Sequence, residues 1–183
     1  AILPGSRNQE IRVKLPIMLE ATKAFENYQL VIAGAPNKSE SFYQEVAQGT
    51  DVKIIENQTY DLLNNSDLAI VTSGTATLET GLFHVPQVVC YKANAISYAI
   101  AKRLIKIKYI SLVNLIMDEA VVTELIQHEL TAKNIIKELK LIEKETSKGR
   151  LEMKKSYQLL EEKLGSGGAS NKVARLLINE INE

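Results

Sequence analysis

Short apolar runs rich in β-branched residues alternate along this chain with stretches of helical periodicity, and this alternation constrains the fold more than any other feature. Strands are expected near residues 1–3, 29–33, 52–55, 68–71, 87–91 and 109–112. Helices between successive strands favour a parallel sheet. The sequence therefore predicts an α/β fold: a Rossmann-like parallel sheet of about six strands, with helices on both faces and a helical C-terminal tail.

The segments between the strands carry the helical signals. Helices are expected at residues 9–27, 39–48, 60–63, 75–83, 93–107, 119–127, 131–145, 148–164 and 169–181. Pro16 is expected to kink or restart the first of them, and Ser39 to cap the second. Because no strand signal follows residue 112, the chain is expected to divide into a sheet domain at residues 1–127 and a helical extension at residues 128–183.

Composition and charge limit the possible functions. Apolar residues make up 45% of the chain and charged residues 24%, and Lys plus Arg equals Asp plus Glu at 22 each, so bulk charge indicates no nucleic-acid partner. No apolar run approaches the ~20 residues that span a bilayer, and no signal-type start is visible, so a cytoplasmic location is expected. Cys90 is expected in the core. His84 and His128 have no suitably spaced partners for a metal ion.

The strongest local signal is a buried-type strand that leads into a turn of small residues and then a helix, at residues 67–79. Ligands bind at the carboxyl ends of parallel strands, and the free amides of a helix start suit a diphosphate. The turn Ser73-Gly74-Thr75 and Thr77 offer donors, and Glu79 could accept from both ribose hydroxyls. Equally compatible with these residues alone is a simple helix cap. No P-loop or dinucleotide-binding glycine motif is present.

A second strand-end turn, Leu3-Pro4-Gly5-Ser6-Arg7, precedes the first helix. The Arg7 guanidinium could form paired bonds to phosphate oxygens and stabilise a departing nucleotide diphosphate. The alternative is a surface arginine near a helix start. Asn114 follows the last expected strand, where its amide could hold a sugar or a phosphate, although a lone asparagine there is also ordinary turn chemistry.

Taken together, these residues resemble the lipid A disaccharide synthase family in order and spacing. The segments that carry the resemblance are Leu3-Pro4-Gly5-Ser6-Arg7, Ser73-Gly74-Thr75-Ala76-Thr77-Leu78-Glu79, Val88-Val89-Cys90-Tyr91-Lys92, Ala101-Lys102-Arg103, Tyr109-Ile110-Ser111-Leu112-Val113-Asn114-Leu115 and Glu124-Leu125-Ile126-Gln127. The resemblance runs from residue 1 to about residue 127, continues loosely through the tail, and matches only the C-terminal half of the family. Val113 and Thr123 stand where the family often has proline.

The resemblance implies a two-domain glycosyltransferase of the GT-B fold, of which this chain is the C-terminal, UDP-sugar-binding domain. The N-terminal domain, with the acceptor site and the general base, is expected to be absent from this chain. The implied reaction transfers 2,3-diacylglucosamine from UDP to 2,3-diacylglucosamine 1-phosphate (lipid X) and releases UDP, with no metal or other cofactor. Carried over by position, the catalytic residues are Arg7 and Asn114, and the UDP-binding residues are Gly5, Ser6, Ser73, Gly74, Thr75, Thr77, Glu79 and Gln127.

The resemblance also implies a peripheral enzyme at the cytoplasmic face of the inner membrane of a Gram-negative bacterium. It implies a homodimer that exchanges C-terminal segments beyond the flexible joint Ser166-Gly167-Gly168, although a tail packed on its own domain is equally compatible. Two alternatives remain open. One is a UDP-sugar epimerase-like domain of the same architecture, disfavoured by the scarcity of histidine. The other is a non-catalytic dimerisation module with a vestigial nucleotide pocket.

Overall fold

The computed structural model of the chain describes residues 1–50, 52–93, 108–165, 173–174 and 177–178. Its strands form one parallel sheet: β1 Ile2–Leu3, β2 Val31–Gly34, β3 Lys53–Glu56, β4 Ala69–Thr72, β5 Gln87–Tyr91 and β6 Thr123–Ile126. The order across the sheet is β3-β2-β1-β4-β5-β6. Successive strands thus run outward from β1 to one edge and then return to its other side at β4. Such a reversal is the point at which doubly wound sheets bind ligands.

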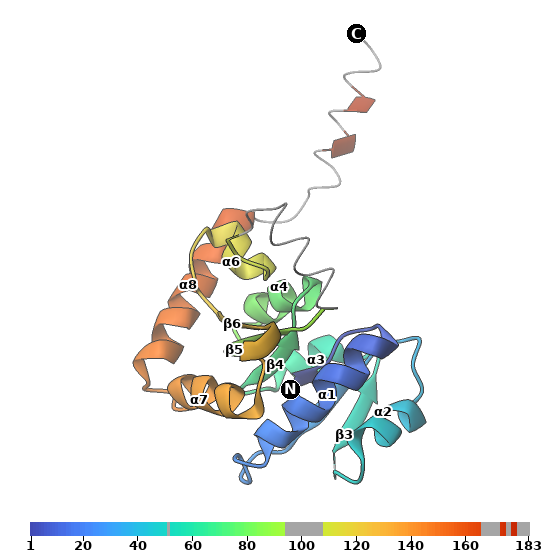
Figure 1. Cartoon of the computed structure of the whole chain (residues 1–183). Helices are drawn as coiled ribbons and strands as arrows, with labels where there is room; N and C mark the ends of the chain where they lie inside the picture. The colour runs from blue at the N-terminus through green and yellow to red at the C-terminus, as the bar shows by residue number, and fades with distance from the viewer. Residues whose placement is uncertain (51, 94–107, 166–172, 175–176, 179–183) are drawn as a thin grey trace.

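Helices cover both faces of the sheet, as the sequence predicts (Figure 1). Their bounds are α1 Asn8–Thr22, α2 Glu40–Ala47, α3 Thr59–Asn64, α4 Thr75–Leu82, α6 Leu112–Met117, α7 Ala132–Ile142 and α8 Lys148–Leu164, with a 3₁₀ turn at Gln127–Glu129. The larger core joins α1, α2 and α7 to the sheet through residues such as Ile11, Ile32 and Ile135. The smaller core lies on the other face, where α3 packs against β4 through Leu63 and Val71. Strand and helix positions up to β5 follow the sequence prediction closely.

Helix α1 forms because Ile11, Leu15 and Met18 recur on one face and are fully buried. Of the two effects expected at Pro16, a restart does not occur, since the helix continues to Thr22. A kink at Pro16 stays a prediction. Pro16 lies on the exposed side of the helix, where water can hydrate the carbonyl group that loses its hydrogen bond. The uninterrupted helix carries its first turns to the carboxyl end of β1.

Two sequence predictions around the sixth strand are wrong. Residues 109–112 do not form a strand, since Ser111 instead caps α6 by accepting a hydrogen bond from the backbone N–H of Asn114. The sixth strand is β6, inside the stretch predicted as helix, and its Leu125 pairs in register with Cys90 of β5. Only Leu125 of the four residues of β6 is buried, so the strand shows no repeated alternation of apolar and polar residues that a sequence prediction could use.

The C-terminal helices α7 and α8 pack on the sheet domain of their own chain. Ile135 and Leu139 of α7 join the core under α1, and Tyr157 and Leu160 of α8 lie close to Gly81 in α4. The division of the chain after residue 127 stays a prediction. The predicted helix at residues 93–107, the joint at residues 166–168 and most of the predicted helix at residues 169–181 lie outside the described residues.

Candidate functional site

A cleft of about 1290 Å³ opens at the carboxyl ends of β1, β2, β4 and β5. It spans the junction between β1 and β4, where the strand order reverses. The turns after β1 and β4 and the first turns of α1 and α4 form its walls. Most of the predicted site residues line it: Gly5, Ser6, Arg7, Ser73, Gly74, Thr75 and Glu79. The fold therefore brings the two strand-end turns, almost seventy residues apart in the sequence, to one cleft.

The turn after β4 is shaped by a glycine. Gly74 has φ 156° and ψ −162°, a conformation that glycine adopts far more readily than other residues, and a Cβ there would meet nothing within 4 Å. Ser73 anchors the turn, since its Oγ donates to the carbonyl of Ile110 at 2.8 Å. Helix α4 begins directly after Gly74, and no side chain of the described residues caps it. Its first amides are thus left for a ligand or water at the edge of the cleft.

The turn after β1 also requires a glycine. Gly5 has φ 100°, and a Cβ there would lie 3.3 Å from Oε2 of Glu10 and 3.3 Å from Cγ2 of Thr72. Helix α1 begins two residues beyond Ser6, with Arg7 in the capping position and no side-chain cap among the described residues. By contrast, α2, α6 and α7 each begin at a serine or threonine whose side chain accepts from the helix; α3 and α8 lack such a bond.

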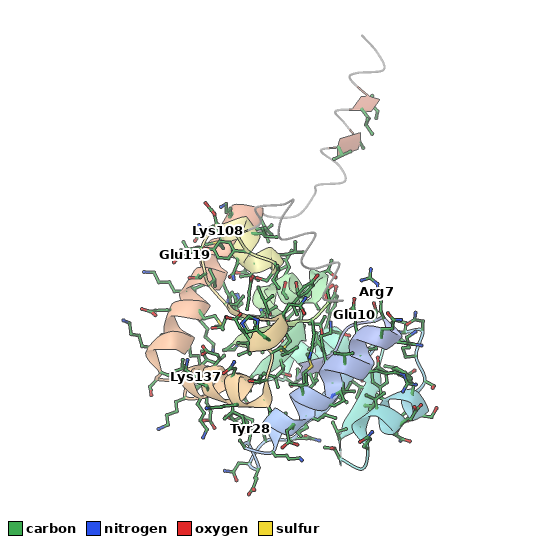
Figure 2. All side chains as sticks on the ribbon, viewed as in Figure 1. Arg7, Glu10, Tyr28, Lys108, Glu119 and Lys137 are labelled. Atoms are coloured by element: carbon green, nitrogen blue, oxygen red, sulfur yellow. The ribbon has the colours of Figure 1, made fainter. Side chains whose placement is uncertain are left out.

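An ion-paired trio of side chains, Arg7, Glu10 and Lys14, follows the start of α1 along one side of the cleft. Nη1 of Arg7 donates to Oε1 of Glu10 at 2.9 Å, and Arg7 keeps 82% of its side chain exposed (Figure 2). Nζ of Lys14 lies 3.4 Å from the other oxygen, Oε2. Burial tends to raise the pKa of Glu10, but the hydrogen bonds and charges of Arg7 and Lys14 outweigh it, so the pKa is lowered and the carboxylate stays ionised.

Lys14 is a cleft residue that the sequence analysis missed. It occupies the buried face of α1 and only 1% of its side chain is exposed. Burial lowers the pKa of its ammonium group, and the neighbouring Glu10 carboxylate opposes that shift. One signal in the sequence could have found it: a lysine placed among Ile11, Leu15 and Met18, four residues after a glutamate, interrupts an apolar stripe with a charge that needs a partner.

The opposite wall of the cleft carries Glu79. Its Oε1 accepts a hydrogen bond from the hydroxyl of Tyr60 at 3.3 Å, and no other hydrogen bond from the described residues reaches this carboxylate. Tyr60 is itself exposed and lies tilted on Phe83, with 5.4 Å between ring centroids. The Glu79 charge raises the pKa of the Tyr60 hydroxyl, which keeps the phenol a donor. Among the described residues, therefore, only Tyr60 donates to the Glu79 carboxylate, and its other acceptor positions are available to a ligand.

Three predicted site residues do not line the cleft, and the first is Thr77. It is fully buried, and its Oγ1 donates to the carbonyl of Gly74 at 2.8 Å and accepts from the N–H of Leu112 at 3.3 Å. Thr77 thus ties the Gly74 turn to the start of α6 from behind. Its predicted contact with UDP stays a prediction.

Asn114 and Gln127 also lie away from the cleft. Asn114 is 1% exposed; its Nδ2 donates to the Val122 carbonyl at 2.9 Å and to Oε1 of Glu124 at 3.0 Å, and its Oδ1 accepts from the Val122 N–H at 2.9 Å. Gln127 has φ 54°, and its buried Nε2 has no hydrogen-bond partner among the described residues. The structure does not bring either residue to Arg7, and their functional roles stay predictions.

Two further properties bear on the kind of site present. Within the described ranges, no group of three or more His, Cys, Asp and Glu side chains is placed to hold a metal ion. None of the described helices is both long and apolar enough to cross a membrane. The donors that the cleft does offer are backbone amides, hydroxyls and cations, which are the usual ligands of phosphate oxygens.

Fold and cleft define a Rossmann-like α/β domain with an open cleft at the reversal of strand order. The family model for lipid-A-disaccharide synthetase matches residues 1–177, and the chain belongs to this family. This confirms the resemblance seen in the sequence. The cleft turns, which carry much of that resemblance, lie within the matched range.

Similar proteins include three lipid-A-disaccharide synthases. That of Solibacter usitatus is 36% identical over 188 residues, which cover 100% of this chain and 49% of the relative. That of Syntrophus aciditrophicus is 35% identical over 188 residues, which cover 99% of this chain and 49% of the relative. That of Psychromonas ingrahamii is 39% identical over 144 residues, which cover 74% of this chain and 38% of the relative. The chain spans about half the length of the curated relatives it matches.

Proposed function

We propose that this chain is the donor-binding half of a lipid-A-disaccharide synthase and that its cleft binds the diphosphate and ribose of a UDP-linked sugar. One observation carries the proposal: two glycine turns, after β1 and β4, start two helices without side-chain caps at the same cleft. The partial positive charge of a helix start and its unpaired amides suit a diphosphate, and the adjacent Arg7 adds a full charge.

Different residues of the cleft are proposed to bind different parts of the UDP-linked sugar. Gly5, Ser6 and the turn Ser73-Gly74-Thr75 are proposed to hold phosphate oxygens, since small residues let the backbone approach. Arg7 is proposed to stabilise the negative charge that grows on the departing UDP. Glu79 is proposed to accept hydrogen bonds from the two ribose hydroxyls, with its orientation held by Tyr60.

Residues behind the cleft are proposed to act by positioning. Asn114 holds Glu124, whose carboxylate accepts from the backbone N–H of Ile110, and the carbonyl of Ile110 in turn accepts from Ser73. Through this route Asn114 can fix the turn after β4 without contact to UDP. Gln127, directly after β6, is proposed to bind UDP through its side-chain amide, whose Nε2 has no hydrogen-bond partner among the described residues.

In the complete enzyme, the chain would serve the transfer of 2,3-diacylglucosamine from UDP to 2,3-diacylglucosamine 1-phosphate. A further domain of the longer protein would supply the acceptor site and the general base. We further propose that residues 1–127 form the nucleotide-sugar domain and residues 128–183 its helical extension, that the enzyme is a homodimer, and that it works as a peripheral protein at the inner face of the inner membrane. The family membership of the chain supports these proposals.

Calorimetric titration of the chain with UDP tests the binding proposal, with uridine as the comparison ligand. Because the proposed contacts concentrate on the diphosphate, UDP should bind at least about tenfold more tightly than uridine. Equal affinities would place the recognition elsewhere. An absence of heat with UDP up to millimolar concentration would overturn direct binding by this chain.

A further inference from the structure

Lys14 is a buried residue of the cleft whose ammonium group has few hydrogen-bond partners among the described residues. The side chain lines the cleft although only 1% of it is exposed. Side chains on a helix lean towards its N-terminus, so the long lysine side chain of α1 reaches back towards the carboxyl edge of the sheet. An ammonium group has three N–H donors, and among the described residues only Glu10 accepts from it, at 3.4 Å. A buried charge with so few partners is costly unless something else binds to it.

Thr72, the last residue of β4, is the second unsatisfied group in this place. Its side chain is 5% exposed, and its buried Oγ1 has no hydrogen-bond partner among the described residues. Thr72 lines the same cleft and pairs in register with Cys90 of β5. Burial raises the pKa of the Cys90 thiol to about 12, and the nearby positive charge of Lys14 opposes that rise. Lys14 and Thr72 thus both line the cleft and both lie near Cys90 of β5.

Gly5 lines the same cleft and lies close to Glu10 and Thr72. A Cβ on Gly5 would meet Oε2 of Glu10 and Cγ2 of Thr72, each at 3.3 Å. Oε2 is the same carboxylate oxygen that Lys14 approaches. Because Gly5 has no side chain, residue 5 does not crowd the Glu10 and Thr72 side chains in this part of the cleft.

Building on the proposed function, we infer that Lys14 and Thr72 form the floor of the diphosphate site. Arg7, Glu10 and Lys14 carry two positive charges and one negative charge. Without Lys14, the Glu10 carboxylate would cancel the charge of Arg7, and the trio would offer no net attraction to an anion. The buried ammonium restores a positive field, which acts strongly because the surroundings are poor in water. The Thr72 hydroxyl donates to a phosphate oxygen or to a water that bridges to it.

The test compares affinities for UDP and uridine, by NMR titration, in the wild-type chain and in K14M, K14R and T72V. K14M should weaken UDP binding about tenfold and leave uridine binding unchanged, since only the diphosphate meets the lost charge. K14R keeps a cation and should stay within about threefold of the wild type. T72V loses one hydrogen bond and should weaken UDP about threefold. Thermal unfolding of each variant tests whether the variant is folded.

The outcomes separate this inference from the proposed function. If K14M binds UDP as tightly as the wild type, Lys14 has no role in the site. Binding of UDP by the wild-type chain would still support the proposed function. Equal losses for UDP and uridine would mean that Lys14 only supports the fold. If the wild-type chain does not bind UDP, both the proposed function and the inference about Lys14 are contradicted. Should K14M fail to fold, K14Q replaces it: loss of the ammonium charge should again weaken UDP binding about tenfold, and UDP binding as tight as in the wild type contradicts the inference.

Discussion

The cleft and the polar cluster behind it use similar residues in opposite ways. We define the inner polar cluster as Thr77, Asn114 and Glu124, which belong to α4, α6 and β6. There, Asn114 makes three hydrogen bonds and the Glu124 carboxylate accepts from two backbone N–H groups and from Asn114. In the cleft, the starts of α1 and α4 have no side-chain cap and the Thr72 hydroxyl has no partner within the described part of the chain.

This difference shows which polar residues are available to a ligand. A side chain whose donors and acceptors are all used inside the protein contributes to stability, because leaving any one of its partners unsatisfied is costly. Groups with unused capacity at an open cleft can bind a ligand without losing existing bonds. The inner polar cluster should therefore affect unfolding, and the cleft should affect UDP binding.

The largest expected effect is on stability, from Asn114→Ala. The substitution leaves Val122 N–H, Val122 carbonyl and Glu124 without their buried partner, so the free energy of unfolding should fall by ~3 kcal/mol. Urea unfolding followed by circular dichroism measures it. The matched control is Asn134→Ala, whose amide makes one exposed hydrogen bond to the Glu129 carbonyl and should cost at most ~1 kcal/mol. Equal losses in the two variants would contradict the distinction.

A smaller effect on stability, together with an effect on binding, is expected at Gly5. Gly5→Ala must adopt φ near 100° and place its Cβ against Glu10 and Thr72, at a cost of ~2 kcal/mol. Gly49→Ala is the control, since Gly49 has φ 81° but open space around it and should cost ~1 kcal/mol. Urea unfolding gives both values. Only Gly5→Ala should also weaken UDP binding, and a loss of binding in Gly49→Ala would refute the assignment.

Arg7→Ala should separate binding from stability. The side chain is 82% exposed and, among the described residues, is bound to Glu10 alone, so the unfolding midpoint should not change measurably. The lost charge-assisted bonds to the diphosphate should weaken UDP binding about tenfold in calorimetry. Lys23→Ala removes a similarly exposed cation, paired with Glu20 at the other end of α1, and should leave the affinity unchanged. If both variants bind UDP equally well, Arg7 is not a ligand contact.

The smallest effect is expected from Tyr60→Phe. It removes the hydrogen bond to Glu79 and retains the ring that lies on Phe83, so the fold should be unaffected. Because one neutral hydrogen bond to the carboxylate is lost, UDP affinity should fall only about two- to threefold. Titration with UDP lacking the ribose 2′-hydroxyl provides the control, since that ligand should lose less from the substitution than UDP does. Identical losses would argue against a ribose contact of Glu79.

The sequence was most informative where buried strands meet glycine turns. Strands buried on both faces of a parallel sheet appear as continuous apolar runs, and this makes β1, β2, β4 and β5 recognisable. Gly5 and Gly74 directly follow two of those runs, so the turns could be placed at one edge of the sheet before the strand order was known. The topology then brings them together.

The remaining features depend on contacts that sequence spacing does not encode. Asn114 was expected at the site because residues 109–112 were predicted as a strand; its true partners, Val122 and Glu124, lie in and beside β6, which was predicted as helix. The sequence of α1 marks Lys14 as a charge within an apolar stripe, but the proposed role of Lys14 in the cleft also depends on Thr72 at the end of β4. Short edge strands and buried charges need the tertiary structure to be interpreted.

Mapping UDP-induced shifts of the backbone amide signals tests the central claim most directly. With UDP, the largest changes should fall on the amides of Gly5, Gly74 and Thr75, at the two helix starts that face the cleft. The amides of Asn114 and Val122 in the inner region should move little. Large shifts centred on Asn114 with unchanged signals at Gly5 and Gly74 would contradict the assignment of the cleft as the diphosphate site.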